Sequence, residues 1–232
     1  MTHRKLAVKI CCMRNERELA LAAAAGADFV GLVGPMPSGP GVLSLERAGE
    51  LAAQMPGDVT AVLLTSGTDP EVIVAQVRAT GVGAVQLVRH HSPAVRAALR
   101  RALPDVILMQ VLHVEGREAL RAVREMTELA DVLLLDSGRP AGGAPELGGT
   151  GRRHDWEVSA EIVRRSTIPV MLAGGLTPES VAEAVGRVRP WGVDVCSGLR
   201  DAEGALLPHL LHDFVRSARR CGRRENPHRP PK

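Results

Sequence analysis

The sequence predicts an α/β protein that folds as a single (β/α)8 barrel, a TIM barrel. Apolar runs of four to eight residues alternate, about eight times, with longer segments of helical period. The runs are nearly continuous, as expected of parallel strands buried on both faces. At 232 residues, the chain also has the usual length of eight β/α units in one domain. A doubly wound open sheet is the alternative that this pattern allows.

The expected elements follow one another in strict alternation. Strands are predicted over residues 6–10, 28–33, 59–64, 84–87, 106–113, 132–136, 170–173 and 193–196. Helices are predicted over residues 16–25, 44–54, 70–79, 93–103, 117–129, 156–165, 178–187 and 206–219. Three helix starts carry a capping side chain followed by proline, at Asp69-Pro70, Ser92-Pro93 and Thr177-Pro178. We therefore expect a barrel domain over residues 1–220 and a basic tail over residues 221–232.

Composition limits the possible partners and locations. Hydrophobic residues make up 45% of the chain and charged residues 24%, as is usual for a soluble globular domain. The net charge is only +3, and much of the basic excess lies in residues 216–232, which we expect to be solvated rather than bound to nucleic acid. The chain has no run of eighteen apolar residues and no signal-peptide pattern at its start, so we expect a cytoplasmic protein without membrane contact. The four cysteines lack zinc-site spacing, and no metal or organic cofactor is expected.

Three glycine-rich segments, in the second half of the chain, point to a phosphorylated ligand. Two of them directly follow predicted strands, and the first lies in an unusually long connection, residues 137–155, that we interpret as an active-site flap. Backbone N–H groups in such loops converge on anions at the carboxyl ends of barrel strands. The residues assigned to this cradle are Gly148, Gly149, Thr150, Gly151, Gly174, Gly175, Ser197 and Gly198.

A thiol and a carboxyl group also lie at predicted strand ends. Cys11 ends the first strand and Asp136 ends the sixth, so a closed barrel would bring both to one mouth, where they could act as general base and general acid. Lys9 lies on the same face of its strand as Cys11, and its ammonium group would favour the thiolate. Each has a purely structural alternative: Cys11 as a buried apolar residue, Asp136 as a loop cap and Lys9 as an ion-pair partner.

Taken together, these residues resemble the phosphoribosylanthranilate isomerase family, on a barrel of the ribulose-phosphate-binding type. The resemblance runs from about residue 8 to residue 214. Its motifs are Lys9-Ile10-Cys11, Ala25-Gly26-Ala27-Asp28, Val85-Gln86-Leu87, Leu134-Leu135-Asp136-Ser137, Gly148-Gly149-Thr150-Gly151 with Asp155-Trp156, Leu172-Ala173-Gly174-Gly175-Leu176, and Gly192-Val193-Asp194-Val195 with Ser197-Gly198.

The resemblance implies an Amadori rearrangement of N-(5-phosphoribosyl)anthranilate in tryptophan biosynthesis. Asp136 would protonate the ring oxygen to open the furanose, and Cys11 would take the proton from C2′ of the resulting imine. Lys9, Gln86 and Arg89 would join the glycine loops in binding the substrate. We expect a monomer or a homodimer.

The chain departs from the family pattern at three places. Cys12 stands where the family usually has glycine, and Gly41 replaces an arginine that would hold the anthranilate carboxylate. Val88-Arg89 replaces His-Gly, so Arg89 could supply a substitute guanidinium group. Two alternatives therefore stay open: an enzyme for a different phosphoribosyl arylamine, and a barrel that binds a phosphorylated ligand without catalysis.

Overall fold

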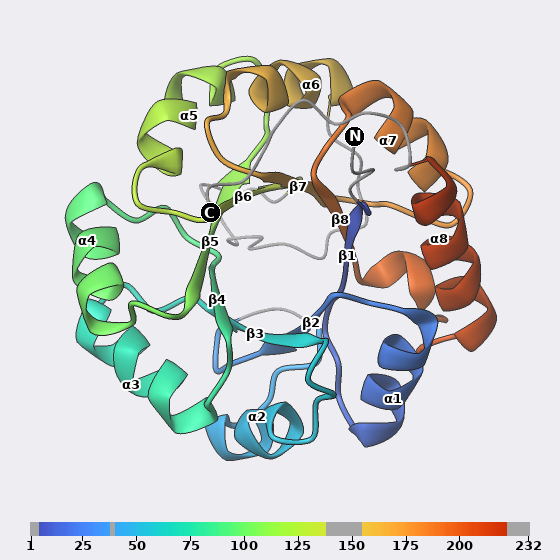
Figure 1. Ribbon diagram of the computed structural model, residues 1–232, viewed down its shortest axis with the longest axis horizontal. Helices are drawn as coiled ribbons and strands as arrows, with labels where there is room; N and C mark the ends of the chain where they lie inside the picture. The colour runs from blue at the N-terminus through green and yellow to red at the C-terminus, as the bar shows by residue number, and fades with distance from the viewer. Residues whose placement is uncertain (1–4, 38–39, 138–154, 222–232) are drawn as a thin grey trace.

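The protein forms a closed barrel of eight parallel strands, surrounded by helices (Figure 1). The computed structural model describes residues 5–37, 40–137 and 155–221. The strands are β1 (Ala7–Ile10), β2 (Phe29–Val33), β3 (Thr60–Thr65), β4 (Ala84–Leu87), β5 (Ile107–His113), β6 (Val132–Asp136), β7 (Val170–Leu172) and β8 (Gly192–Val195). The helices are α1 (Glu16–Ala25), α2 (Leu45–Ala52), α3 (Pro70–Thr80), α4 (Pro93–Ala102), α5 (Ala119–Thr127), α6 (Trp156–Arg165), α7 (Val181–Val188) and α8 (Pro208–Cys221), with a 3₁₀ turn η1 (Ser197–Leu199).

Pairing of the first strand with the last closes the sheet. Ala7 is in register with Gly192, and Lys9 is in register with Asp194, so the predicted barrel is confirmed and the open-sheet alternative is wrong. Closure removes both sheet edges. It also turns every strand's carboxyl end toward one mouth.

The predicted elements all occur, with differences at their ends. The largest concerns α7, which begins at Val181 rather than Pro178. Thr177 still receives hydrogen bonds, because its hydroxyl accepts the Ser180 N–H at 3.3 Å and its carbonyl accepts the Val181 N–H at 3.0 Å. Pro178 therefore lies in a turn before the helix. The predicted helix over residues 117–129 is also shorter, since α5 ends at Thr127.

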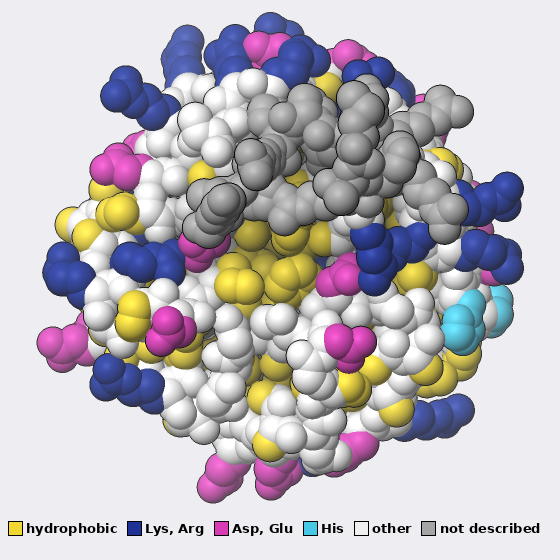
Figure 2. Space-filling view, viewed as in Figure 1, with side chains coloured by type: hydrophobic (Ala, Val, Ile, Leu, Met, Phe, Trp, Pro, Cys, Tyr) yellow, Lys and Arg dark blue, Asp and Glu magenta, His cyan; other side chains and the backbone are white. Residues whose placement is uncertain are grey.

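Apolar side chains form two layers. The larger cluster lies between the sheet and the helices, and includes Ile10, Val30 and Leu63 on the outer face of the strands. The smaller cluster fills the barrel itself, with Met109 and Leu134 among its members. Seen along the barrel, apolar side chains show at the centre of the ring while charged side chains lie mainly around its rim (Figure 2).

The last described helix, α8, extends to Cys221. The guanidinium group of Arg219 donates to the carbonyl groups of Leu6 and Gly26 and to the Asp28 carboxylate, the last at 2.6 Å. Arg216 to Cys221 thus belong to α8, which ends two residues beyond the helix end predicted at residue 219. Residues 222–232 lie outside the described part of the chain. No helix that the structure describes is long and apolar enough to cross a membrane.

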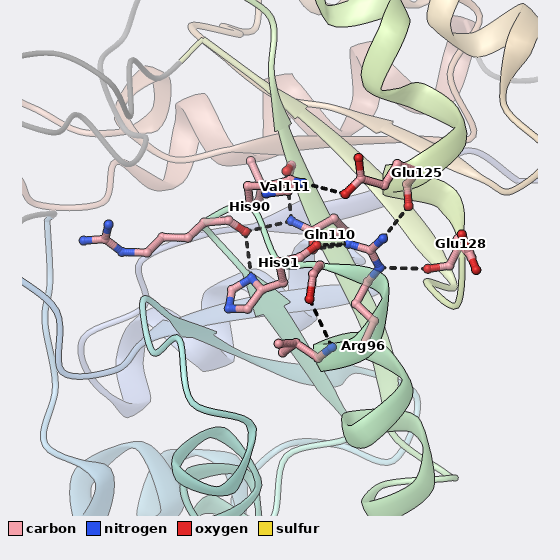
Figure 3. A network of polar contacts seen from close by, with 10 residues as sticks. His90, His91, Arg96, Gln110, Val111, Glu125 and Glu128 are labelled. Carbon is pink, nitrogen blue, oxygen red and sulfur yellow. Dashed lines mark hydrogen bonds and ion pairs between the residues drawn. The ribbon is translucent and has the colours of Figure 1, made fainter.

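A buried arginine fixes the segment that follows β4 (Figure 3). Arg96, from α4, donates to the carbonyl oxygens of His91, Glu125 and Glu128, the last at 2.8 Å. Gln110, which points outward from β5, donates from its amide nitrogen to the Arg89 carbonyl at 2.8 Å. Both ring nitrogens of His91 also face carbonyl oxygens, so this buried histidine anchors the same segment.

Candidate active site

The mouth of the barrel brings together side chains that are far apart in the sequence. Cys11 directly follows β1, while His113 and Asp136 are the last residues of β5 and β6. Side chains alternate between the two faces of a strand, and these three lie on the face that points toward the barrel axis. On β5, for example, Met109 and Val111 precede His113 on the interior face. The predicted meeting of the ends of β1 and β6 at one mouth is therefore present.

The Cys11 thiol lies against β2, above a buried ion pair. A β-carbon at Gly31 would be only 2.6 Å from the Cys11 sulfur, so glycine at this position leaves the space that the thiol occupies. Below it, the Lys9 ammonium nitrogen lies 3.0 Å from a carboxylate oxygen of Asp194, and the Lys9 side chain is completely buried. Burial alone would lower the pKa of Lys9, but Asp194 and Cys11 raise it above its ordinary value. Lys9 is therefore a permanent cation next to the thiol, and it is also an ion-pair partner.

Asp136 lies in an environment that raises the pKa of its carboxyl group. The side chain is 9% exposed, and burial raises its pKa, with Asp194 acting in the same direction. The Ser137 N–H, which donates to Asp136 at 2.7 Å, and nearby charge on His113 and Lys9 act in the opposite direction. A buried carboxyl with a raised pKa is suited to general acid catalysis near neutral pH.

The loops after β7 and β8 approach each other closely through their backbones. Gly174 and Gly175 both have positive φ angles, 83° and 63°, which favour glycine. At Gly198, a β-carbon would lie 2.1 Å from the carbonyl oxygen of Leu176, so the two loops touch directly. The N–H groups of Gly174, Gly175, Ser197 and Gly198 have no acceptor within the described residues. They are free to bind an anion.

Gln86 and Arg89 lie on and just after β4. Gln86 faces the barrel interior and is 4% exposed. Its side-chain amide oxygen has no hydrogen-bond partner in the described part of the chain. The Arg89 side chain is half-buried, and its Nε is likewise unpartnered among the described residues. Gly148, Gly149, Thr150 and Gly151, with the long connection that contains them, lie outside the described residues.

The segment after Cys11 is strained and held by a second buried ion pair. Cys12 has a φ of 64°, in the left-handed region that favours glycine. Arg200 donates to the Cys12 carbonyl at 2.6 Å and to both carboxylate oxygens of Glu18 at 2.9 Å. These bonds tie the segment between β1 and α1 to the segment after η1. The two segments lie on either side of the place where β1 pairs with β8 to close the barrel.

Sequence reasoning placed no role on Asp194 or Gly31. Asp194 carried a detectable signal, because an acidic residue within an apolar strand is almost always paired. The proximity of Gly31 to Cys11 depends on the register between β1 and β2, which the sequence does not show. Among the described residues, no group of three histidine, cysteine or acidic side chains could hold a metal ion.

Fold and site together define a class of protein: a TIM barrel with a thiol and a carboxyl group at the carboxyl ends of its strands. Comparison with known proteins then gives the family. Residues 8–216 match the model of N-(5′-phosphoribosyl)anthranilate (PRA) isomerase, and the chain belongs to this family.

Individual relatives agree over nearly the whole chain. The N-(5′-phosphoribosyl)anthranilate isomerase of Halobacterium salinarum is 40% identical over 91% of this chain and 94% of its own length. N-(5′-phosphoribosyl)anthranilate isomerase 2 of Methanosarcina mazei is 34% identical over 91% and 93%. The solved structure of the isomerase from Pyrococcus furiosus has a TM-score of 0.78 and 28% identity, covering 93% of this chain and 99% of that one.

One solved relative carries a ligand. It is a phosphoribosyl anthranilate isomerase in complex with reduced 1-(o-carboxyphenylamino)-1-deoxyribulose 5-phosphate, with a TM-score of 0.76 and 25% identity over 92% of this chain. That ligand combines a phosphate, a pentulose chain and a carboxyphenylamino group. The sequence-based expectation of a phosphorylated substrate is in agreement with it.

Proposed function

We propose that Cys11 and Asp136 are the general base and general acid of this protein. As a member of the family, the protein is an aldose–ketose isomerase that converts N-(5′-phosphoribosyl)anthranilate to 1-(o-carboxyphenylamino)-1-deoxyribulose 5-phosphate, a step of tryptophan biosynthesis. The observation that carries the assignment of roles is the contrast between the two groups: a thiol beside a buried ammonium, and a buried carboxyl with a raised pKa.

The reaction needs one proton delivered and one removed. Asp136 gives its proton to the ring oxygen as the C1′–oxygen bond breaks, and the lone pair of the substrate nitrogen forms the C=N bond. The Cys11 thiolate then takes the proton from C2′ to give an enolamine, which becomes the ketone as C1′ gains a proton and the C2′ hydroxyl loses one. The buried ammonium group of Lys9 lies beside the Cys11 sulfur that takes the C2′ proton. Because Lys9 is completely buried, we assign it to Cys11 rather than to direct contact with the substrate.

The phosphate is assigned to the loops after β7 and β8. Four unpartnered N–H groups there can surround a dianion without any charged side chain. Gln86 offers its unpartnered amide oxygen to the sugar from the interior of the barrel. Gly148 to Gly151 remain a predicted third part of this cradle.

The carboxylate of the anthranilate requires a cation, and two arginines are candidates. Arg89 follows β4 at the mouth. Arg14 packs against Gly41, since a β-carbon there would lie 3.3 Å from its Cγ and 3.4 Å from its Nε. The space left by the missing side chain at position 41 is thus occupied by Arg14. Arg14→Met and Arg89→Met should show which arginine binds the carboxylate. Loss of a charge-assisted pair costs ~1.5–3 kcal/mol, so the variant that lacks the binding arginine should have a KM raised at least about tenfold.

Replacement of the two proposed catalytic groups tests the mechanism. Cys11→Ser and Asp136→Asn preserve side-chain size, and each should lower kcat by two to four orders of magnitude, about the contribution of a general acid or base. Turnover is measured by the change in fluorescence as the anthranilate substrate is consumed, with circular dichroism as the check on folding. Cys221→Ser, at the end of α8, is the control and should turn over normally. Near-normal kcat in either active-site variant would refute the assignment of that residue.

A further inference from the structure

Arg14 carries a guanidinium group without a counter-charge at the mouth of the barrel. It lies in the segment between β1 and α1, three residues after Cys11. Within the described part of the chain, the guanidinium group makes no hydrogen bond or ion pair, and its Nε is buried. The nearby carboxylate of Glu18 accepts the backbone N–H of Arg14 at 3.1 Å, but both of its oxygens are bonded to Arg200. A partly buried cation without a partner costs free energy, which a negatively charged ligand would offset.

Two loops without side chains at the point of contact hold Arg14 in place. A β-carbon at Gly41, after β2, would lie 3.3 Å from the Cγ of Arg14 and 3.4 Å from its Nε. A β-carbon at Gly204, after η1, would lie 2.8 Å from Nη2 and 3.1 Å from Nη1. The side chain therefore extends from the loop after β2 to the loop after β8, the two strands on either side of β1. Nη1 and Nη2 are not among the buried unpartnered atoms, so a ligand can reach them.

Apolar side chains adjoin this part of the mouth. Val42 directly follows Gly41 and is 46% exposed. Met36, in the same loop, is half-buried and packs against the interior cluster that contains Cys11 and Val33. Exposed apolar surface next to a guanidinium group is complementary to an aromatic ring that carries a carboxylate.

The proposed chemistry places the aryl group on the same side of the barrel. Cys11 acts at C2′, and the next carbon, C1′, carries the nitrogen of the aryl group. The phosphate is assigned to the loops after β7 and β8, so the aryl end of the substrate lies beyond Cys11, toward β2. Arg89 follows β4, which is three strands from β1 in the barrel. The order of groups along the substrate therefore favours Arg14 over Arg89.

We propose that Arg14 binds the carboxylate of the aryl group and determines the preference of this protein for an anthranilate-type substrate. This inference rests on the function proposed above. Nη1 and Nη2 donate two parallel hydrogen bonds to the two carboxylate oxygens. The substrate thereby supplies the counter-charge that Glu18 gives to Arg200, and Met36 and Val42 contact the ring.

A pair of substrates, with and without the carboxylate, tests the proposal. The natural protein should turn over N-(5′-phosphoribosyl)anthranilate with a kcat/KM at least about tenfold above that for N-(5′-phosphoribosyl)aniline, because a charge-assisted pair is lost with the aniline. Arg14→Met should remove most of this preference by lowering kcat/KM for the anthranilate alone. Arg14→Lys, which keeps the charge but not the planar fork, should retain part of it. Arg17→Met, at an exposed arginine of α1, is the control and should behave as the natural protein does.

Equal losses on both substrates in Arg14→Met would mean that Arg14 is only structural. A preference that survives in Arg14→Met, or that disappears in Arg89→Met alone, would mean that the carboxylate binds elsewhere. A natural protein without any preference would mean that it has no carboxylate site. Each of these outcomes overturns the proposal. High activity of Cys11→Ser or Asp136→Asn would instead refute the proposed catalytic roles, so the two failures can be told apart.

Gly204→Ala tests the same site while the arginine is kept, and it decides the matter if Arg14→Met does not fold. Its β-carbon would displace the guanidinium group, so the preference for the anthranilate should fall at least about threefold. Gly26→Ala is the matched control, because Gly26 has a similar φ, 88° against 81°, but nothing within 4 Å of its β-carbon. It should keep the full preference. An unchanged preference in Gly204→Ala would overturn the proposal.

Discussion

Gly198 shows how one missing β-carbon shapes the site. A β-carbon there would come within 2.1 Å of backbone, which cannot move aside as a flexible side chain could. Gly198→Ala should therefore displace the loop after β8 from the loop after β7. We expect KM for the phosphorylated substrate to rise about tenfold or more, equivalent to ~1.4 kcal/mol of binding, with a smaller effect on kcat.

Gly186 provides the matched control for this prediction. It lies within α7, and nothing lies within 4 Å of a β-carbon built there. Gly186→Ala should leave KM unchanged and stabilise the helix by up to about 1 kcal/mol. Steady-state kinetics and urea denaturation measure both effects. An unchanged KM for Gly198→Ala would argue against phosphate binding by these loops.

Asp136 should make the protein less stable as the pH rises. An acid with a raised pKa in the folded protein binds more protons there than in the unfolded chain, where the ordinary value is 3.8. The free energy of unfolding then falls as the pH rises from about 3.8 toward the folded-state pKa. Asp136→Asn removes this pH dependence. The free energy of unfolding of the variant, relative to that of the natural protein, should therefore increase with pH across that range.

Urea denaturation at a series of pH values measures the trend. Asp105→Asn, at an exposed carboxyl group, serves as control and should follow the natural protein at every pH. A constant difference between Asp136→Asn and the natural protein would show that burial does not hold the carboxyl in its protonated form. The residue would then be unsuited to the acid role near neutral pH.

Among the elements, α1 and the segment after η1 depend on one buried ion pair. The side chains of Glu18 and Arg200 are only 9% and 4% exposed, and Arg200 also binds the Cys12 carbonyl. Glu18→Gln leaves the guanidinium group buried without its counter-charge. Loss of one partner of a buried pair costs about 3–5 kcal/mol. We expect a loss of this size in the free energy of unfolding, together with lower activity because Cys12 follows Cys11.

An exposed pair gives the comparison. Glu183 and Arg187, one turn apart on α7, have side chains that are about half exposed, and Glu183→Gln should cost under about 0.5 kcal/mol. Chemical denaturation of both variants provides the two values. Equal effects would mean that burial of the Glu18–Arg200 pair has no energetic consequence.

At the scale of the whole molecule, α8 completes the barrel at its closure. Phe214 and Ala218 are completely buried, and Arg219 is bonded to the segment around β1. A chain that ends at Cys221 should unfold at the same urea concentration as the full chain and retain its activity. A chain that ends at Asp213 loses these contacts and should not fold cooperatively. Loss of activity in the longer of the two chains would contradict the prediction that residues 222–232 form a solvated tail.

Much of the architecture could be predicted because local patterns specify it. Helices α1 and α6 and strands β4 and β6 have the predicted bounds, since an apolar run or a helical period coincides there with capping residues or turns. The start of α7 was predicted three residues too early, because Thr177 accepts the hydrogen bonds of a turn before the helix begins. Local sequence signals do not distinguish these two geometries.

The sequence by itself determined the repeated β/α units, the thiol and carboxyl at strand ends and the glycines of the candidate phosphate loops. Those features are local, since each depends on residues close together along the chain. Only the tertiary structure decided which distant residues are in contact. These contacts join Lys9 to Asp194, 185 positions apart, Gly31 to the Cys11 thiol, and His113 to the Val88 carbonyl. Such contacts follow from barrel closure and strand register, which arise from packing of the whole sheet rather than from any one segment.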